Sequence, residues 1–358
     1  MTTATDLALL RLVALRVAGP PPADAAAAVR LLTCVQAQEL PGAVTSVALR
    51  TAQRTRAGVE AALECGAVVR SWPMRSTLHL LPAEDLPWLL ALCGPRVLAG
   101  AARRRAVLGV TDADTERARD LVTAALTGGR RRGRRDLLAA VADGGVATTG
   151  QRGYHLLWYL AQTGTLCLGP MADGEQQFVL LDEWVPAPRR LDRDAALAEL
   201  ALRYLRGHGP ATVADLARWS GLTVTDVRAG VAAVRDQLTA VEVDGREHLM
   251  APETADLLAA CRGQAAGLFL LPGFDELVLG YADRSCTVPP QFADRIVPGG
   301  NGVFRPTVVH GGRVLGTWAW QGPRSGREGA DRTVAATPFT AFPDDVAAAI
   351  PAAAAALP

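Results

Sequence analysis

The stretch ATVADLARWSGLTVTDVRAGVAAVRDQLTAVEVDGREHLMA, residues 211–251, decides the fold of this chain. Thr212 is placed to cap a first helix, because a threonine side chain accepts a hydrogen bond from the free N–H groups of a helix start. The residues SGL then turn the chain, and Thr223 or Thr225 caps a second helix. Two β-forming runs flank Asp244-Gly245, a strong signal for a two-residue hairpin. This order predicts a helix-turn-helix followed by a wing.

The same order of elements occurs twice more towards the N-terminus, without obvious sequence identity. In both segments, apolar residues at helical spacing are followed by two short β-rich runs. The expected helices are 5–17, 25–36, 41–50 and 56–65, then 112–127, 136–142 and 151–163, and finally 194–206 ahead of the stretch quoted above. The expected hairpin strands are 67–72 with 76–81, and 165–170 with 176–181. Beyond the third hairpin, short apolar runs among many Gly and Pro predict strands of a small barrel or sheet, and the tail AAAIPAAAAALP predicts a short helix.

These elements predict an α+β chain with three tandem winged-helix units and a small C-terminal β-rich domain. The 358 residues are enough for several domains. We expect a first unit at 1–95, a basic linker and second unit at 96–190, a third unit at 191–262 and the β-rich domain at 263–358. A transcriptional regulator normally has one such module per subunit and dimerises on two half-sites. Three different units favour a monomer with a concave surface that cradles one DNA site.

The charge of the chain is balanced overall but concentrated locally. Apolar residues make up 49% of the sequence and the net charge is +1, which excludes a wholly disordered chain and a strong overall field. All 37 basic residues are Arg, a bias that genome composition explains. Residues 96–135, however, hold eleven Arg against four acids, a net charge of +7. Such a surface attracts DNA phosphates regardless of base sequence, although a solvated loop is the alternative. We expect phosphate contacts from Arg103, Arg104, Arg105, Arg130, Arg131, Arg132, Arg134, Arg135 and, on the second unit's recognition helix, Arg152.

The sequence indicates neither a metal nor a cofactor. The six Cys are scattered without a C-x-x-C pair, and the five His lack metal-ligand spacing. We therefore expect small buried cysteines in a reducing compartment. No segment resembles a signal peptide or a membrane span, so we expect a soluble cytoplasmic protein associated with the nucleoid and with no membrane partner.

Gln36 and Gln38 form the most distinctive polar pair. They lie two residues apart at the expected end of a helix, just before Pro41. In an extended backbone, residues i and i+2 point the same way, so two amides could hold one water between them. The alternative is a pair of solvated side chains at a helix end.

Five stretches carry a resemblance to a known family. They are VQAQELPGA (35–43), VVRSWPMRSTLHLLPAEDLPWLL (68–90), RYLRGHGPATVADLARWSGL (203–222), LLPGFDELVLGYADRS (270–285) and FRPTVVHGGRVLGTW (304–318). Together they resemble the AlkZ-like family of bacterial DNA glycosylases, in the same order and over nearly the whole chain. The resemblance implies that Gln36-Ala37-Gln38 is the family's catalytic motif. A related branch has Asp in place of the second Gln, so Gln38 implies the branch that excises bulky alkylguanine adducts or unhooks crosslinks. Some members of that branch protect antibiotic producers from their own product.

The implied chemistry suits the residue types. An N7-alkylguanine or N3-alkyladenine is cationic and leaves as a neutral base, so no strong general acid is needed. The enzyme has to place water on C1′ and stabilise a sugar with oxocarbenium character. An amide can orient water but cannot ionise to a strong base. A Schiff-base lyase step needs an amine, usually Lys; this chain has no Lys, and only its N-terminal amine could serve. We therefore expect a monofunctional glycosylase that acts on double-stranded DNA with an alkylated purine.

Other polar residues leave two readings open. Arg75 and His79 could contact phosphate or line the lesion cleft. The alternative for His79 is a strand histidine that faces solvent or satisfies a backbone group. Asp275 and Glu276 either close the active-site wall or satisfy Arg284 and nearby backbone. A transcriptional regulator without catalysis and a crosslink-binding repair accessory remain the competing functions.

Overall fold

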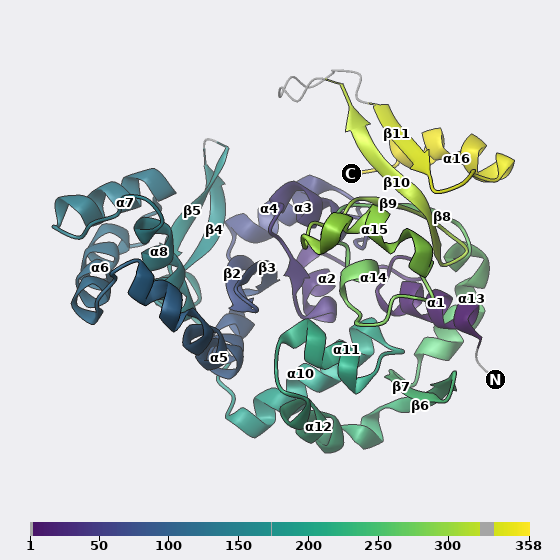
Figure 1. Cartoon of the computed structure of the whole chain (residues 1–358), viewed down its shortest axis with the longest axis horizontal. Coiled ribbons are helices and arrows are strands. Elements are labelled where there is room, and N and C mark those ends of the chain that lie inside the picture. The colour runs from purple at the N-terminus through teal and green to yellow at the C-terminus, as the bar shows by residue number, and fades with distance from the viewer. Residues whose placement is uncertain (1–2, 173, 323–332) are drawn as a thin grey trace.

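The computed structural model describes residues 3–172, 174–322 and 333–358 (Figure 1). The first segment contains α1 (Ala4–Ala14), α2 (Ala25–Leu32), β1 (Val35–Gln36), α3 (Leu40–Ala48), α4 (Arg56–Glu64), β2 (Val68–Met74) and β3 (Thr77–Pro82). The predicted helices and hairpin are therefore present, with one important difference at the second helix. None of the helices in the described part of the chain combines the length and apolar composition that a membrane span requires.

The second segment forms a lobe that Figure 1 shows at one end of the molecule. It contains α6 (Asp112–Leu126), α7 (Arg134–Asp143), α8 (Arg152–Gln162), β4 (Leu166–Ala172), β5 (Glu175–Leu180) and α9 (Leu181–Trp184). The long helix α5 (Leu86–Val107), preceded by the 3-10 turn η1 (Ala83–Asp85), connects this lobe to the first segment. Arg103–Arg105 lie within α5, a helix that is not among those expected from the sequence.

The third segment contains the helix-turn-helix and hairpin that the opening stretch predicts. Its elements are α10 (Arg193–His208), α11 (Val213–Ser220), α12 (Val224–Ala233), η2 (Arg235–Gln237), β6 (Thr239–Val243), β7 (Arg246–Met250) and α13 (Thr254–Ala265). Thr212 and Thr223 cap α11 and α12 as predicted, each accepting from the N–H of an aspartate three residues on. Gly221, between the helices, has φ of +76°, which glycine adopts at low cost.

The last segment combines an open sheet with short helices. Its elements are β8 (Leu268–Leu271), α14 (Glu276–Leu279), η3 (Pro290–Phe292), α15 (Ala293–Ile296), η4 (Pro298–Gly300), β9 (Thr307–His310), β10 (Arg313–Gln321), β11 (Thr333–Pro338) and α16 (Asp344–Ala355). The four strands form an antiparallel sheet in the order β11-β10-β9-β8, and the predicted terminal helix is α16. Of the two predicted forms, barrel or sheet, the chain adopts a sheet.

The hairpins of the first two segments are not separate wings. They share one five-stranded sheet in the order β1-β3-β2-β4-β5, joined where Arg70 pairs with Leu168. The sequence pattern assigns each hairpin to its own unit. The observed pairing of Arg70 with Leu168 crosses the expected boundary between the units 1–95 and 96–190. It joins the lobe of the second segment directly to the sheet that carries Gln36.

The helix predicted over 25–36 ends at Leu32, and this is the difference that matters for function. Thr33 has φ of +66°, which an α-helix does not accommodate. Val35 and Gln36 then pair with Leu80 and His79 of β3. The pairing buries Val35 completely, and this tertiary gain outweighs local helix propensity. The Gln36 motif therefore begins on a strand.

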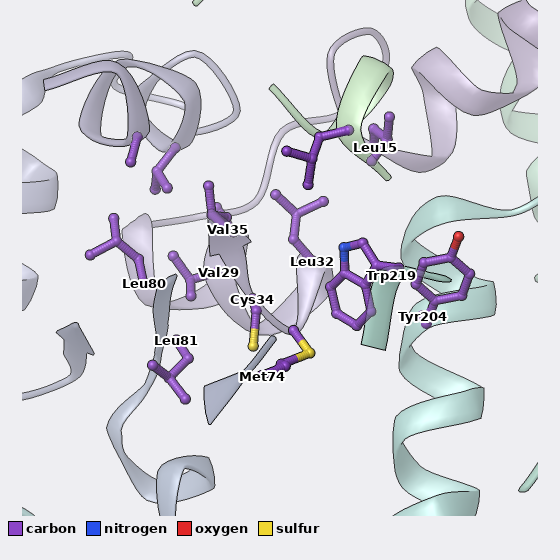
Figure 2. Packing of buried hydrophobic residues seen from close by; sticks show 14 of the residues in the cluster. Leu15, Val29, Leu32, Cys34, Val35, Met74, Leu80, Leu81, Tyr204 and Trp219 are labelled. Carbon is purple, nitrogen blue, oxygen red and sulfur yellow. The ribbon is translucent and has the colours of Figure 1, made fainter. Parts of the chain in front are cut away.

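The main hydrophobic core surrounds this strand. Figure 2 shows Cys34 and Val35 among Leu32, Leu80 and Met74, with Trp219 and Tyr204 packed alongside from the third segment. Three tryptophans are buried: Trp219 lies in this core, whereas Trp72 and Trp318 lie in two separate hydrophobic clusters, and their exposed fractions are 1%, 1% and 5%. Four cysteines are buried as expected, whereas Cys65 is exposed and Cys261 is half-buried.

Candidate active site

Gln36 and Gln38 occupy different environments at the edge of the five-stranded sheet. The Gln36 side chain is only 7% exposed, and its Oε1 atom is buried without a hydrogen-bond partner. Gln38 follows the end of β1 and is exposed. One amide of the motif therefore lies inside the fold and the other faces outward.

The β1–β3 ladder is interrupted at the motif, and the interruption orients Gln38. Ala37 N–H donates to the Leu78 carbonyl at 2.7 Å, so a regular antiparallel pair would return a bond from Leu78 N–H to the Ala37 carbonyl. Instead, Leu78 N–H donates to Oε1 of Gln38 at 3.0 Å. Because a backbone N–H can only donate, this contact fixes which end of the Gln38 amide is oxygen. The other end of the Gln38 amide is therefore Nε2, which carries two donors.

A buried acidic residue, Glu276, contacts the backbone of the motif. Glu276 at the start of α14 is fully buried, and its Oε1 accepts from Gln36 N–H at 3.3 Å. Its Oε2 accepts from Trp219 Nε1 at 2.9 Å and contacts His208 Nε2 at 3.2 Å. Three segments far apart in the sequence therefore meet at one carboxylate behind Gln36.

The neighbouring Asp275 makes a separate buried pair with Arg50 at the end of α3. The two side chains are 1% and 0% exposed and form two hydrogen bonds of 2.9 Å. Burial by itself raises the pKa of Asp275, but the Arg50 guanidinium and nearby donors outweigh it and lower the pKa. Neither acid pairs with Arg284, whose Nε donates to the Val278 carbonyl. The reading that these acids satisfy Arg284 was wrong, because Arg50 and the Glu276 cluster occupy both carboxylates. The part of that reading that concerns nearby backbone is confirmed, because Asp275 accepts from Leu277 N–H and Glu276 from Gln36 N–H.

His79 pairs with Gln36 across β1 and β3, and its side chain is neutral and fully buried. Burial, with the nearby Arg75 cation, lowers the pKa of His79 to about 3. Its neutral ring therefore donates from Nδ1 to the Thr77 carbonyl at 2.8 Å and accepts at Nε2 from Arg75 at 3.3 Å. The His79 side chain has no exposed surface, so it does not face solvent. It is a strand histidine that satisfies a backbone group, the Thr77 carbonyl. Arg75 itself is half-buried at the hairpin tip, with φ of +54°.

The predicted phosphate-binding arginines fall into two groups. Arg105, Arg131 and Arg152 pair with carboxylates of the chain, and Arg130 donates to the Thr127 and Ala124 carbonyls. Arg152 in particular also donates to the Leu108 and Gly109 carbonyls, at 2.6 and 2.8 Å. The other members have exposed side chains, and one of them, Arg135, also contacts Asp136 at 3.5 Å: Arg103, Arg104, Arg132, Arg134 and Arg135. The exposed group is the better source of phosphate contacts, and those contacts stay a prediction.

Sequence reasoning missed Arg70, His208 and Trp219 as neighbours of the motif. Arg70 donates to the Ala37 carbonyl from Nε and Nη2, at 2.9 and 2.6 Å. Its signal was a charged residue inside the otherwise apolar and small run VVRSW.

Within residues 3–172, 174–322 and 333–358, no group of three or more His, Cys, Asp or Glu is arranged to hold a metal ion.

Exposed arginines gathered on one lobe are typical of a protein that binds nucleic acid. The family described as "DNA glycosylase AlkZ-like" matches residues 29–358, and the chain belongs to this family. It is thus a DNA glycosylase, an enzyme that hydrolyses an N-glycosyl bond, and its context is DNA repair.

Two comparisons with proteins of Streptomyces sahachiroi agree with this assignment. The chain is 31% identical over 318 residues to the "Interstrand DNA cross-link repair glycosylase", covering 85% of this chain and 82% of the relative. The solved structure of "DNA glycosylase AlkZ" superposes with a TM-score of 0.80 at 26% identity, covering 98% of this chain and 95% of the other.

Proposed function

We propose that this glycosylase releases cationic N-alkylated purines, in particular bulky N7-alkylguanine adducts and interstrand crosslinks. The observation that carries the proposal is that the carboxylates beside the motif are already engaged. Glu39 caps α3 by accepting from Gly42 N–H at 2.7 Å, and both Glu276 oxygens are held by buried donors. The amides are then the polar groups left for the substrate. Without a free general acid, the leaving base must already be activated by its own positive charge.

The reaction needs little from the protein beyond placement. The water oxygen forms a bond to C1′ while the C1′–N bond breaks, and the bonding electron pair cancels the charge of the purine. The released proton passes to solvent, because an amide cannot hold it. We assign Gln38 to contact with the water or the sugar through its Nε2 donors. Gln36 offers a buried, unpartnered carbonyl oxygen, the kind of acceptor that an ordered water satisfies.

The relative named for crosslink repair supports the choice of a bulky substrate. We interpret the three helix-and-hairpin segments as tandem winged helices whose concave surface holds duplex DNA, with the chain acting as a monomer. The exposed arginines of the second lobe are assigned to phosphates of that duplex. The shared sheet, which joins this lobe to the motif, supports that assignment.

A substrate panel tests the proposal. Duplexes with one N7-methylguanine, one bulky N7-alkylguanine or one uracil are incubated with excess enzyme, and abasic sites are cleaved with mild alkali. We expect release of both cationic bases and none of uracil. Release of uracil contradicts the charge argument. No release from any duplex, together with a sequence-selective footprint on undamaged DNA, favours the regulator, and tight lesion binding without release favours the repair accessory.

A further inference from the structure

Arg70 connects the catalytic motif to the second lobe. It lies on β2, in the centre of the five-stranded sheet, and its side chain is half-buried. Besides its two bonds to the Ala37 carbonyl, Nη2 lies 3.4 Å from the Gln38 carbonyl. Its third nitrogen, Nη1, donates to Oε1 of Gln176 on β5 at 2.9 Å. One guanidinium therefore contacts residues at both edges of the sheet, Ala37 just after β1 and Gln176 on β5.

The partner on β5 is itself held in place. Gln176 is 7% exposed, and its Nε2 donates to the Gly169 carbonyl of β4 at 3.0 Å. Burial, with the Arg134 cation nearby, lowers the pKa of Arg70 to about 10, so the side chain stays charged at neutral pH. A planar guanidinium suits this task because its donors have a fixed fork geometry that lysine lacks.

The contact explains why the ladder is interrupted. A carbonyl oxygen has two acceptor positions, and two Arg70 nitrogens are directed at Ala37. Leu78 N–H then takes the side-chain oxygen of Gln38 in place of the Ala37 carbonyl. Occupation of one carbonyl thus sets the direction of the neighbouring amide.

We propose that Arg70 is a positioning residue that orients the Gln38 amide for catalysis and couples it, through Gln176, to the lobe that holds the DNA. This inference rests on the proposed function and deepens it. Arg70 acts through Gln38 and need not touch the substrate. Removing Arg70 lets Leu78 N–H return to the Ala37 carbonyl and frees the Gln38 amide to rotate.

The test uses Arg70→Gln, Arg70→Lys and the matched control Arg284→Gln in the full-length protein. Arg284 is also half-buried, also donates to a backbone carbonyl, and its pKa is also lowered to about 10. Single-turnover base release is measured with saturating enzyme, alongside DNA affinity and melting temperature. Misplacing a reacting group by 1 Å costs about 100-fold in rate, so we expect a loss of about that size for Arg70→Gln and only partial recovery with Arg70→Lys. DNA affinity and melting temperature should change no more than in Arg284→Gln.

The double variant Arg70→Gln/Gln38→Ala separates positioning from general destabilisation. If Arg70 acts through Gln38, the double variant releases base at the rate of Gln38→Ala alone. Multiplied losses overturn the proposal, and so does an Arg70→Gln rate equal to that of the wild type. Hydrogen exchange of residues 35–41 provides a readout without activity, and it should accelerate in Arg70→Gln but not in Arg284→Gln. A wild type that releases no base defeats the proposed function, while unchanged exchange in Arg70→Gln defeats this inference.

Discussion

Replacing Asp275 by Asn tests how the C-terminal segment is held against the motif. The substitution keeps the shape of the side chain but removes the charge that neutralises Arg50. Both groups are buried, with two bonds of 2.9 Å between them and a third of 2.8 Å from Ser46 Oγ to Asp275. Removing one partner leaves a buried guanidinium without its counter-charge, which costs about 3–5 kcal/mol.

The loss is measured as the change in the free energy of unfolding in urea at pH 7. Asp112→Asn is the control, because Asp112 also contacts an arginine, at 2.7 Å, but is 95% exposed. An exposed pair contributes about 0–1 kcal/mol, so the control should be nearly silent. The lowered pKa of Asp275 adds a pH signature. The wild-type advantage is complete above the usual carboxyl pKa, and it disappears as the pH falls through the pKa of the folded state.

A loss below about 1 kcal/mol for Asp275→Asn, the range of an exposed pair, would refute this reasoning. The double variant Arg50→Met/Asp275→Leu gives a second check, because replacing both partners by apolar groups is often neutral. It should recover most of the lost stability. If it is as unstable as the single variant, the cost comes from packing and not from the unpaired charge.

Three further predictions concern other parts of the molecule. The folded pKa of His79 lies near 3 and its ordinary value is 6.5, so the unfolded chain binds the extra proton between these values. The free energy of unfolding should therefore fall by about 1.7 kcal/mol between pH 6.5 and pH 5 through this group, and urea titrations of His79→Gln at these two pH values should show a fall that is smaller by that amount. Arg134→Ala/Arg135→Ala should weaken DNA binding and reduce the salt slope by about 0.9 for each phosphate that is no longer neutralised, and an unchanged slope would remove these residues from the interface. Because the chain has no Lys, borohydride should trap no covalent complex with DNA, and a trapped species would contradict the monofunctional assignment.

Local signals predicted the elements well. Asp244-Gly245, with Asp244 at φ of +51° and Gly245 at +71°, forms the hairpin turn that its sequence indicates. The capping threonines of α11 and α12 are likewise local in effect. Helix α5 has no comparable local signal, because Pro95 inside it is a strong helix breaker that tertiary packing overrides.

Long-range contacts account for what the sequence could not predict. The end of α2 depends on pairing between Gln36 and His79, which are far apart in the chain. The shared sheet depends on the Arg70–Leu168 pair, and neither hairpin sequence encodes its neighbour. Gln36 and Gln38 were identified through a motif, but the contact of Gln36 N–H with Glu276 and the orientation of the Gln38 amide by Leu78 N–H depend on distant residues.

Arginine clusters show a similar limit. The count of positive charges over 96–135 predicts a basic surface but not which guanidiniums are engaged within the fold. Arg131, for example, pairs with Glu64 of the first segment at 2.5 Å and lies over the Trp184 ring. Only the assembled structure shows that the Arg131 side chain, although exposed, is held by contacts within the fold.

The most direct test of the account is single-turnover release of a bulky N7-alkylguanine by wild type, Gln36→Ala/Gln38→Ala and Gln53→Ala. Gln53 is an exposed glutamine of the same segment outside the motif, so it controls for loss of an amide. We expect rapid release by wild type and Gln53→Ala, and release reduced to the uncatalysed rate in the double variant although it still binds the duplex. Release by the double variant at the wild-type rate would contradict the assignment of catalysis to the Gln36–Gln38 pair.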